Sequence, residues 1–370
     1  MTSSNIAALQ KCASNTLDGS AIGENLIVGV IGDAPSHYSK SPRLWNAAFR
    51  HLAMNATYLP FDVDDAQVGN LLAALKDSNG FLGVNVTVPH KLRVMDYLDE
   101  LDPGAEKIGA VNTIVRTPDG RLIGYNTDGE GFIESILTRQ PDRTQSFIPS
   151  LKGMNVLLLG AGGSARAVAF HLADLLDGGE LIICNRTLEH ATSLTAEVQK
   201  TGGHAVAIDE GKLTANAPKA GLIVNCTTKG QGGVRKVPNG AAIMLEPYSS
   251  LAPAHPAEFP QTFLPETDTD EKRRAAAAQD IDVNNLASMA LARCIPSETR
   301  FYDLIYHPEE TIFLHHGRMT GHSTMNGKSM IINQAVIAFC KRICSAELQA
   351  AGIDTAETRK QILEVMYQAW

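Results

Sequence analysis

The chain has 370 residues, of which 44% are hydrophobic and 19% charged, and its formal net charge is −8. A chain of this length usually builds more than one hydrophobic core, so we expect two domains. The acidic balance and the lack of a lysine and arginine cluster argue against a nucleic-acid partner. No apolar run approaches the roughly 18 residues of a membrane-spanning helix. Residues 1–24 lack the charged start and apolar core of a secretory signal, which predicts a flexible leader and a cytoplasmic protein.

The six cysteines are scattered along the chain. None forms a CxxC pair or a Cys/His cluster with the spacing of a zinc site, so we expect no metal centre and reduced thiols. Cys340 and Cys344 are four residues apart on a predicted helix, a spacing typical of core packing.

Segments with the patterns of strands and helices alternate in the first third of the chain. Residues 26–32 (LIVGVIG) form a continuous apolar run that ends in glycine, which is typical of a buried parallel strand. A helix that starts with Ser41 and Pro42 is predicted over 41–53. The pattern continues with a strand over 56–63, a helix over 64–78 and a strand over 81–89. This order predicts a parallel sheet with right-handed crossovers.

Residues 110–126 interrupt the alternation. Two β-rich runs flank the turn signal at 118–120 (Pro-Asp-Gly), which predicts a hairpin. A helix is expected from Asp128 to Leu137, and we place the first domain boundary near Asp128.

A second alternation begins at residues 155–163 (NVLLLGAGG). Further strands are predicted over 181–186, 204–208, 222–227 and 301–306. Residues 231–300 are rich in proline, alanine and charge, and no element is assigned to most of them. The helices predicted over 327–345 and 354–370 are expected to fold back on the first domain.

A glycine-rich turn opens the second half. Gly160, Gly162 and Ala165 fit the pattern GxGxxG/A between an apolar strand and a helix. The glycines allow a tight turn and a close approach of the backbone to a pyrophosphate, and the helix N-terminus offers free N–H groups. A strand-to-helix turn without a ligand is the alternative, but the further strand at the right interval favours a dinucleotide.

The end of the next strand distinguishes NADP from NAD. An acidic residue there would bind the ribose 2′-hydroxyl of NAD, but this chain has Asn185, Arg186 and Thr187. No carboxylate stands there to repel a 2′-phosphate, and the guanidinium of Arg186 can bind one. We therefore expect NADP, with NAD as the alternative. His190, one turn further on, is expected to be a solvated helix residue.

Polar side chains gather where the strand over 81–89 ends. Asn85 and Thr87 share one face of this strand, since side chains alternate along it. Lys91 follows at the carboxyl edge of the sheet, where α/β proteins place their ligands. Asp128, at the exit of the hairpin, is either a partner for Lys91 or a helix cap.

Three more polar residues indicate the same site. Asn112 stands within an apolar stretch, and a hydroxylated substrate could satisfy its amide. Ser39 and Ser41 follow the first strand beside a helix start, where hydroxyl and N–H groups suit a carboxylate. Simple helix capping is the alternative for one of these serines.

In order and spacing, these segments resemble the shikimate/quinate dehydrogenase family. The motifs are YSKSP (38–42), NVTVPHK (85–91), AVNTIV (110–115), GYNTDG (124–129), GAGGSARA (160–167), NRT (185–187), VNCTTKG (224–230), DLIYHPEET (303–311) and GKSMIINQA (327–335). The resemblance covers roughly 28–232 and 298–345.

The resemblance implies an α/β fold in two domains. An N-terminal α/β substrate domain with a mainly parallel sheet is expected over 25–127 and 325–370, because the C-terminal helices return to it. A Rossmann NADP-binding domain is expected over 128–324, with a long insertion near 233–297. The family reversibly reduces 3-dehydroshikimate to shikimate, and some members prefer quinate. An oxidoreductase acting on a CH–OH group of a small molecule, as a monomer or homodimer, is therefore implied.

The family pattern also implies a role for each matching residue. Lys91 and Asp128 match the catalytic pair. The substrate residues are expected to be Ser39, Ser41, Asn85, Thr87, Asn112, Tyr306 and Gln334. The cofactor residues are expected to be Gly160, Ala161, Gly162, Gly163, Ser164, Ala165, Asn185, Arg186, Thr187, Thr227 and Met330.

The sequence departs from the family pattern at several positions. Tyr38 stands where the family usually has histidine, and Gln231 where it usually has methionine. Lys328 and Ser329 replace a small apolar stretch. His190 stands where many NADP-dependent members carry a second arginine.

Three other functions stay open at this point. Quinate or dual-specificity dehydrogenases share the motifs, although Ser39, Ser41 and Thr87 resemble the shikimate type. A non-catalytic metabolite sensor on the same fold has no need of Lys91 and Asp128. Another Rossmann enzyme, such as a methylene-tetrahydrofolate dehydrogenase, would not share the N-terminal motifs.

Overall fold

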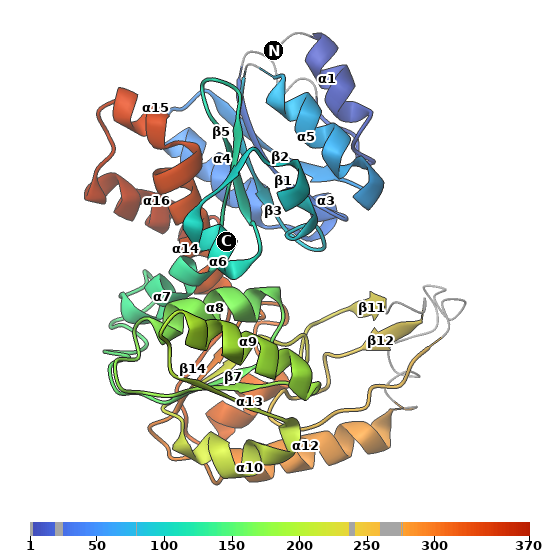
Figure 1. Ribbon diagram of the computed structural model, residues 1–370, viewed down its shortest axis with the longest axis vertical. Helices are drawn as coiled ribbons and strands as arrows, with labels where there is room; N and C mark the ends of the chain where they lie inside the picture. Colours follow the sequence, from blue (N-terminus) through green and yellow to red (C-terminus); the bar gives the residue numbers. More distant parts are fainter. Residues whose placement is uncertain (1–2, 19–24, 79, 237–240, 260–274, 276) are drawn as a thin grey trace. The chain divides into compact units, whose positions relative to one another are not determined.

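The computed structural model describes residues 3–18, 25–78, 80–236, 241–259, 275 and 277–370. The chain divides into two compact units (Figure 1). Unit 1 comprises Met1–Ser146 and Met330–Trp370, and unit 2 comprises Phe147–Ser329. Both units are α/β, as the sequence predicts. In the part of the chain described here, no helix has the length and apolar composition needed to cross a bilayer.

Unit 1 contains a six-stranded sheet in the order β2-β1-β3-β5-β6-β4. Strand β1 pairs in parallel with β2 and β3, whereas β5 pairs antiparallel with β3 and β6. The strands are β1 (Leu26–Gly32), β2 (Ala56–Asp62), β3 (Phe81–Val86), β4 (Glu100–Leu101), β5 (Thr113–Arg116) and β6 (Leu122–Tyr125). The predicted parallel strands and the hairpin are therefore confirmed, although β3 ends three residues before Pro89.

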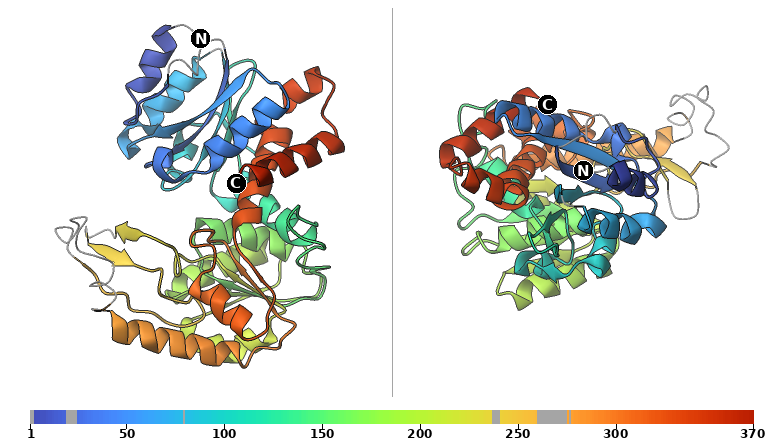
Figure 2. Two further views of the ribbon diagram at one scale, coloured as in Figure 1. Left: turned by 180° about the vertical axis from the view of Figure 1, so that it is seen from behind. Right: turned by 90° about the horizontal axis from the view of Figure 1, so that it is seen from above.

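Helices cover both faces of this sheet (Figures 1 and 2). Helix α1 packs beside α5 in one core, and α4, α14 and α16 build the other. The helices of unit 1 are α1 (Ser3–Gln10), α3 (Pro35–Tyr38), α4 (Ser41–His51), α5 (Val68–Lys76), α6 (Pro103–Ile108), α7 (Asp128–Leu137), α14 (Lys328–Ile337), the π-helical turn η6 (Ala338–Ile343), α15 (Ser345–Ala350) and α16 (Ala356–Gln368), with short 3₁₀ turns η1 (Asp65–Gln67) and η2 (Arg93–Tyr97).

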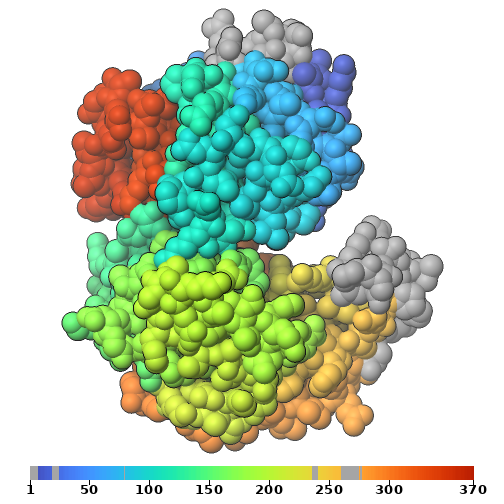
Figure 3. All heavy atoms as spheres, in the orientation of Figure 1, coloured from blue at the N-terminus to red at the C-terminus, as the bar shows by residue number. Residues whose placement is uncertain are grey.

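The C-terminal helices fold back on unit 1, as the sequence predicts. In the second core, the ring centroids of Trp45 lie 5.0 Å from Tyr58 and 5.1 Å from Phe339. Cys340 and Cys344 are buried in the same cluster, which confirms their role in packing. Figure 3 shows the last helices (red) covering one flank of unit 1. Aromatic pairs at such distances add to the apolar burial that holds the terminal segment in place.

The prediction of a flexible leader over residues 1–24 is wrong for much of that segment. Leu9, Ala13 and Leu17 are buried in the core with α5. The backbone N–H of Ser14 donates to the carbonyl of Asp62 at 2.8 Å, and Asn15 Nδ2 donates to Pro60 O at 3.0 Å. The segment covers the edge strand β2, whose unpaired carbonyls would otherwise face solvent. Residues 1–2 and 19–24 lie outside the described part.

The units divide later in the chain than the sequence analysis places its boundaries. Helix α7 groups with unit 1 because Gly131 packs tightly on α14. A Cβ atom on Gly131 would lie 2.6 Å from the Cβ and backbone nitrogen of Gln334. Close helix contact of this kind requires glycine, and residues 128–146 therefore stay with the first unit.

Unit 2 contains a six-stranded parallel sheet in the order β14-β13-β10-β7-β8-β9. Its strands are β7 (Val156–Leu159), β8 (Leu181–Cys184), β9 (Ala205–Ile208), β10 (Leu222–Asn225), β13 (Arg300–Asp303) and β14 (Thr324–Met325). The helices are α8 (Gly163–Ala173), α9 (Leu188–Lys200), α10 (Leu213–Asn216), α12 (Ala278–Ala292) and α13 (Ile312–Met319), with 3₁₀ turns η3 (Glu210–Lys212) and η4 (Ala217–Lys219). The predicted Rossmann architecture is confirmed, and its strand order reverses between β7 and β10, where such sheets bind ligands.

The segment that the sequence left largely unassigned contains a hairpin and a long helix. Strands β11 (Val234–Lys236) and β12 (Ala242–Met244) pair antiparallel, and α12 follows. Helix α12 is tied to α13 through Ser288, whose Oγ lies 2.8 Å from Nδ1 of the buried His316. This contact therefore attaches α12, at the C-terminal end of the insertion, to the Rossmann domain. Residues 237–240, 260–274 and 276 lie outside the described part.

The buried His316 predicts a stability that depends on pH. Burial, reinforced by the charge of His315, lowers the pKa of His316 from 6.5 to about 4. The unfolded chain therefore takes up this proton first, and the stability that His316 contributes is complete above about pH 6.5 and is lost as the pH falls towards 4. We expect His316→Asn to melt below the wild type at pH 7, and the difference to narrow towards pH 4. A difference that stays constant with pH would contradict this account, and His51→Asn, at an exposed histidine, is the control.

Candidate active site

Lys91 and Asp128 form an ion pair at the carboxyl edge of the unit 1 sheet. Lys91 Nζ lies 2.6 Å from Asp128 Oδ2, and the two side chains are 22% and 9% exposed. Asp128 is the first residue of α7, and its backbone N–H donates to Asn126 Oδ1 at 3.0 Å. The structure thus brings the two predicted catalytic residues together, partly shielded from solvent but still reachable.

Asn112 holds the carboxylate of this pair in place. Its Nδ2 donates to Asp128 Oδ1 at 2.8 Å and to Thr127 Oγ1 at 3.0 Å. Its Oδ1 accepts from the Thr127 N–H and from Thr113 Oγ1, both at 2.9 Å. Both oxygens of Asp128 are therefore engaged, one by Asn112 and one by Lys91. The sequence indicated a hydroxylated substrate as a possible partner for this amide, but protein groups already satisfy it.

Gln334 joins the same group from the C-terminal segment. Its Oε1 accepts from Asn112 Nδ2 at 3.4 Å and from Thr127 Oγ1 at 3.3 Å. Helix α14 positions this side chain next to the start of α7, because Gly131 lets the two helices approach closely.

A second branch of hydrogen bonds runs from Asn85 towards the start of α4. Asn85 Nδ2 donates to Thr113 Oγ1 at 3.1 Å, and Tyr58 OH donates to Asn85 Oδ1 at 2.8 Å. Burial raises the pKa of Tyr58 well above its usual value, and a hydrogen bond with Ser41 partly offsets this. The phenol therefore stays neutral and can donate. One connected network extends from Ser41 to Lys91.

Ser39 and Ser41 lie together where α4 begins. The backbone N–H of Ser41 donates to Ser39 Oγ at 3.2 Å, and both serines are partly exposed. The N-cap residue of α4 makes no side-chain capping bond. Pro42 has no N–H, and the N–H groups of Arg43 and Leu44 donate to Lys40 O. The two serine hydroxyls and the partial positive charge of the helix start are therefore the features that favour an anion. Thr87 is also partly exposed, one residue beyond β3.

Sequence reasoning missed several members of this network. Tyr58, Thr113, Thr127 and Asn126 each bond to a predicted site residue. A usable signal is the polar residue within an otherwise apolar strand, which applies to Tyr58 in β2 and Thr113 in β5. Buried polar groups of this kind need partners, and the partners mark the site.

Two predicted residues are not assigned a place in this site. Tyr306 follows β13 in unit 2, and burial raises the pKa of its hydroxyl. Met330 is buried on α14 at the start of the second segment of unit 1. Their contacts with substrate and nicotinamide stay predictions.

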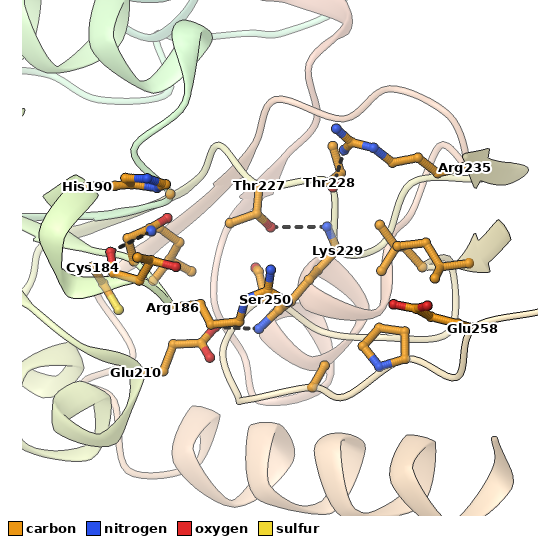
Figure 4. A pocket seen from close by; sticks show the side chains of 18 residues that line it. Cys184, Arg186, His190, Glu210, Thr227, Thr228, Lys229, Arg235, Ser250 and Glu258 are labelled. Atoms are coloured by element: carbon orange, nitrogen blue, oxygen red, sulfur yellow. Dashed lines mark hydrogen bonds and ion pairs between the residues drawn. The ribbon is translucent and has the colours of Figure 1, made fainter. Parts of the chain in front are cut away.

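A pocket of about 730 Å³ opens in unit 2 at the carboxyl ends of β7, β8, β9 and β10 (Figure 4). Five of the predicted cofactor residues line it, namely Gly160, Asn185, Arg186, Thr187 and Thr227. The other predicted residues of the glycine-rich turn are Ala161, Gly162, Gly163, Ser164 and Ala165. Gly162 is the N-cap of α8 and Ala165 is fully buried, as a small residue between helix and strand should be.

Gly160 adopts a backbone conformation that other residues rarely tolerate. Its φ is +106°, and a Cβ atom there would lie 3.2 Å from the backbone carbon and oxygen of Cys226. The tight turn after β7 therefore depends on this glycine, and the turn leaves the first N–H groups of α8 exposed. Such a cradle fits the phosphates of a dinucleotide.

The charges in the pocket also fit a phosphorylated cofactor. Arg186 is exposed at the end of β8, and Asn185 Nδ2 donates to Thr187 O at 2.8 Å, which shapes this loop. Glu210 reaches the pocket from the end of β9, but its Oε1 lies 2.5 Å from Lys229 Nζ. This largely buried pair cancels the charge of a carboxylate that would repel a 2′-phosphate. His190 is exposed on α9, as predicted, and it also lines the pocket.

The described ranges contain no candidate metal centre. No three histidine, cysteine or acidic side chains come together there as the ligands of a metal ion would.

Gly160→Ala should weaken cofactor binding. Alanine at a positive φ costs about 1 kcal/mol or more, and the added methyl group presses on the Cys226 backbone. We expect a lower melting temperature and a Kd for adenosine 2′,5′-bisphosphate raised about tenfold, the equivalent of 1.4 kcal/mol. Gly153→Ala is the matched control, because Gly153 also has a positive φ but has open space around it. Equal binding losses in both variants would show that the turn has no special role.

Comparison with known proteins places the chain in one family. Residues 30–114 match the model described as shikimate dehydrogenase substrate binding domain, and residues 142–236 match that of shikimate / quinate 5-dehydrogenase. The shikimate dehydrogenase (NADP(+)) of Symbiobacterium thermophilum is 36% identical over 86% of this chain and 88% of that protein. The protein of the same name from Carboxydothermus hydrogenoformans is 35% identical over 86% and 92%.

Solved structures agree with this assignment. Shikimate 5-dehydrogenase of Thermus thermophilus, in complex with NADP(H) and shikimate, has a TM-score of 0.62 and 27% identity, covering 93% of this chain and 100% of its own. A quinate dehydrogenase from Corynebacterium glutamicum, at 24% identity and a TM-score of 0.62, shows the shared fold alone and covers 93% of this chain and 99% of its own. The chain belongs to the shikimate dehydrogenase family.

Proposed function

We propose that this protein is an NADP-dependent shikimate dehydrogenase, which transfers a hydride reversibly between shikimate or 3-dehydroshikimate and NADP(H). The observation that carries the proposal is the Lys91–Asp128 pair, which Asn112 holds in place at the carboxyl edge of the unit 1 sheet. Residues 30–114 of this unit match the model of the substrate-binding domain. The names of the relatives at 35–36% identity support the same activity.

Binding of the substrate follows from the two branches of the polar network. Ser39 and Ser41 present hydroxyl groups at the start of α4, where the partial positive charge of the helix favours a carboxylate. Thr87 and Gln334 offer a hydroxyl and an amide group to the ring hydroxyls. Asn85 and Asn112, whose amides already bond within the protein, are proposed to line the site beside them. Fixed donors and acceptors at both ends of a small ring set its orientation, which lowers the entropic part of the barrier.

Proton transfer is the task of Lys91. During oxidation the neutral amine of Lys91 takes the proton of the reacting hydroxyl, and during reduction the ammonium form of Lys91 returns a proton to the carbonyl oxygen. Asp128 holds the amine at 2.6 Å and balances its charge. Bound NADP supplies the nicotinamide that accepts or donates the hydride.

NADP rather than NAD is supported by the charges at the end of β8. This strand is followed by Asn185, Arg186 and Thr187 rather than by an acidic residue, and Lys229 neutralises Glu210 within the pocket. Gly160, Thr187 and Thr227 complete the proposed cofactor site. Tyr306 is proposed as a further substrate residue and Met330 as a nicotinamide contact, from the family pattern alone.

Quinate and a sensor role are less well supported. Three relatives with 35–36% identity carry the name shikimate dehydrogenase, whereas the quinate dehydrogenase, at 24% identity, shares only the fold. A sensor has no use for a proton-transfer pair with both carboxylate oxygens fixed. We further propose a cytoplasmic monomer or homodimer that acts on small molecules.

The first test is the initial rate of NADP and NAD reduction with shikimate and quinate in turn. We expect reduction of NADP with shikimate to have the highest kcat/KM of the four pairs. A clear preference for quinate or NAD would keep the family and overturn the proposed specificity, and inactivity with all four pairs would favour the sensor.

Lys91→Ala should abolish most turnover without abolishing ligand binding. Loss of a general acid–base group typically costs about 10²–10⁴-fold in kcat. Shikimate binding, measured by calorimetry, should change far less than kcat. Lys341→Ala is the control, because Lys341 also pairs with an acidic residue, Glu130, but lies 40% exposed outside the network. A Lys91 variant with the turnover of this control would exclude Lys91 from the reaction.

A further inference from the structure

The nucleotide pocket of unit 2 has two walls of different origin. The first wall is the Rossmann edge, with Gly160, Arg186, Thr187 and Thr227. The second wall comes from the inserted segment. It carries four apolar residues, Ile243, Leu245, Ala254 and Pro256, together with Arg235, Ser250 and Glu258. The family model ends at residue 236, so nearly all of this second wall lies beyond the matched part of the chain.

Lys229 fastens the second wall to the first. Its Nζ pairs with Glu210 Oε1 at 2.5 Å (Figure 4). It also donates to Ala252 O at 2.9 Å, so that it links the end of β9 to the insertion. The Lys229 and Glu210 side chains are only 12% and 15% exposed. A buried ion pair adds little net stability, because desolvation offsets its attraction, but it fixes the position of its partners.

The wall is also held from behind. Asn284, which is 1% exposed, accepts from the Ser249 N–H at 2.8 Å and donates to Pro253 O at 2.9 Å. Ser288 Oγ donates to Ser249 Oγ at 2.7 Å. At the rim, Arg235 Nη1 donates to Thr228 Oγ1 at 2.8 Å and ties the hairpin to the loop after β10. Protein contacts alone therefore define the wall, and a ligand need not order it on binding.

The chemistry of the two walls suits an adenosine. The insertion presents the apolar side chains of Ile243, Leu245, Ala254 and Pro256, which can cover the face of a purine. The Rossmann edge opposite supplies the Arg186 guanidinium and the hydroxyl of Thr187 for the ribose phosphate. An apolar surface facing a polar, cationic edge is what a flat base with an attached phosphate requires.

We propose that the insertion is the second wall of the adenosine subsite, in which Ile243 and its apolar neighbours contact the adenine base and Lys229 positions them. The proposal rests on the proposed NADP site, since it assigns one of its surfaces. It separates the tasks of the two walls: the insertion recognises the base, and Arg186 recognises the 2′-phosphate.

Binding of cofactor fragments tests this division. Calorimetry would give the Kd of adenosine 2′,5′-bisphosphate and of 5′-AMP for the wild type and for Ile243→Ala. Loss of the apolar contact should weaken both fragments by the same factor, about five- to thirtyfold, since a lost aliphatic contact is worth roughly 1–2 kcal/mol. Arg186→Ala should weaken only the 2′-phosphorylated fragment. Val234→Ala, on the same hairpin but outside the pocket lining, should leave both unchanged.

Lys229 is tested as a positioning residue. Lys229→Met should weaken both fragments about tenfold or more, whereas Lys229→Arg, which keeps the charge opposite Glu210, should restore most of the affinity. The KM for shikimate at saturating NADP should stay near that of the wild type in all these variants. Melting curves identify any variant that fails to fold. If a Lys229 variant fails to fold, the fragment affinities of Ile243→Ala decide the proposal.

The outcomes distinguish the two proposals. A wild type that binds neither fragment would overturn the NADP site itself. A wild type that binds both, with a Kd for Ile243→Ala within twofold, would overturn only the second wall. Weaker binding of the 2′-phosphorylated fragment alone would assign the insertion to the phosphate and would also overturn the proposal.

Discussion

The arrangement of the side chains in the substrate site depends on one buried side-chain amide, that of Asn112. Asn112 is 3% exposed, so its nitrogen and its oxygen both need partners inside the protein. The geometry that satisfies them joins strand β5 to the start of α7 and aims Asp128 at Lys91. Because a buried network is stable only when every member is satisfied, the same bonds that allow burial also fix the catalytic geometry.

A comparable constraint operates in unit 2, where the buried groups are charged. The carboxylate of Glu210, at the end of β9, would repel an anionic cofactor, and its burial without a partner would cost free energy. Lys229 neutralises this carboxylate, and it also donates a hydrogen bond to the insertion. One ion pair thus adjusts the electrostatics of the pocket and fixes the position of a wall that the common family pattern lacks.

Segments that are far from the site residues in the sequence help to hold these residues in place. The N-terminal residues that the sequence presents as a leader cover the edge of β2, the strand that carries Tyr58. The C-terminal helices return to the same sheet and bring Gln334 to Asn112. Each unit therefore depends for its site on chain segments that local patterns do not connect.

The sequence by itself determined the local features of this protein. Apolar runs predicted the strands, the turn signal at 118–120 predicted the hairpin, and a glycine pattern located the turn where Gly160 has its positive φ. Strand ends also indicated Asp128 as a possible partner for Lys91, beside the alternative of a helix cap, and the family resemblance implied the pair. These features follow from backbone preferences and periodicity within a few residues.

Only the tertiary structure decided the partners. Asn112 and Gln334 are 222 residues apart, and Lys229 meets Glu210 from a different strand. No local pattern predicts such pairs, because burial and the need to satisfy polar groups act between surfaces that exist only after folding. The same reason explains why the sequence predicts a flexible leader: Leu9 and Leu17 become core residues only when α5 and β2 lie beneath them.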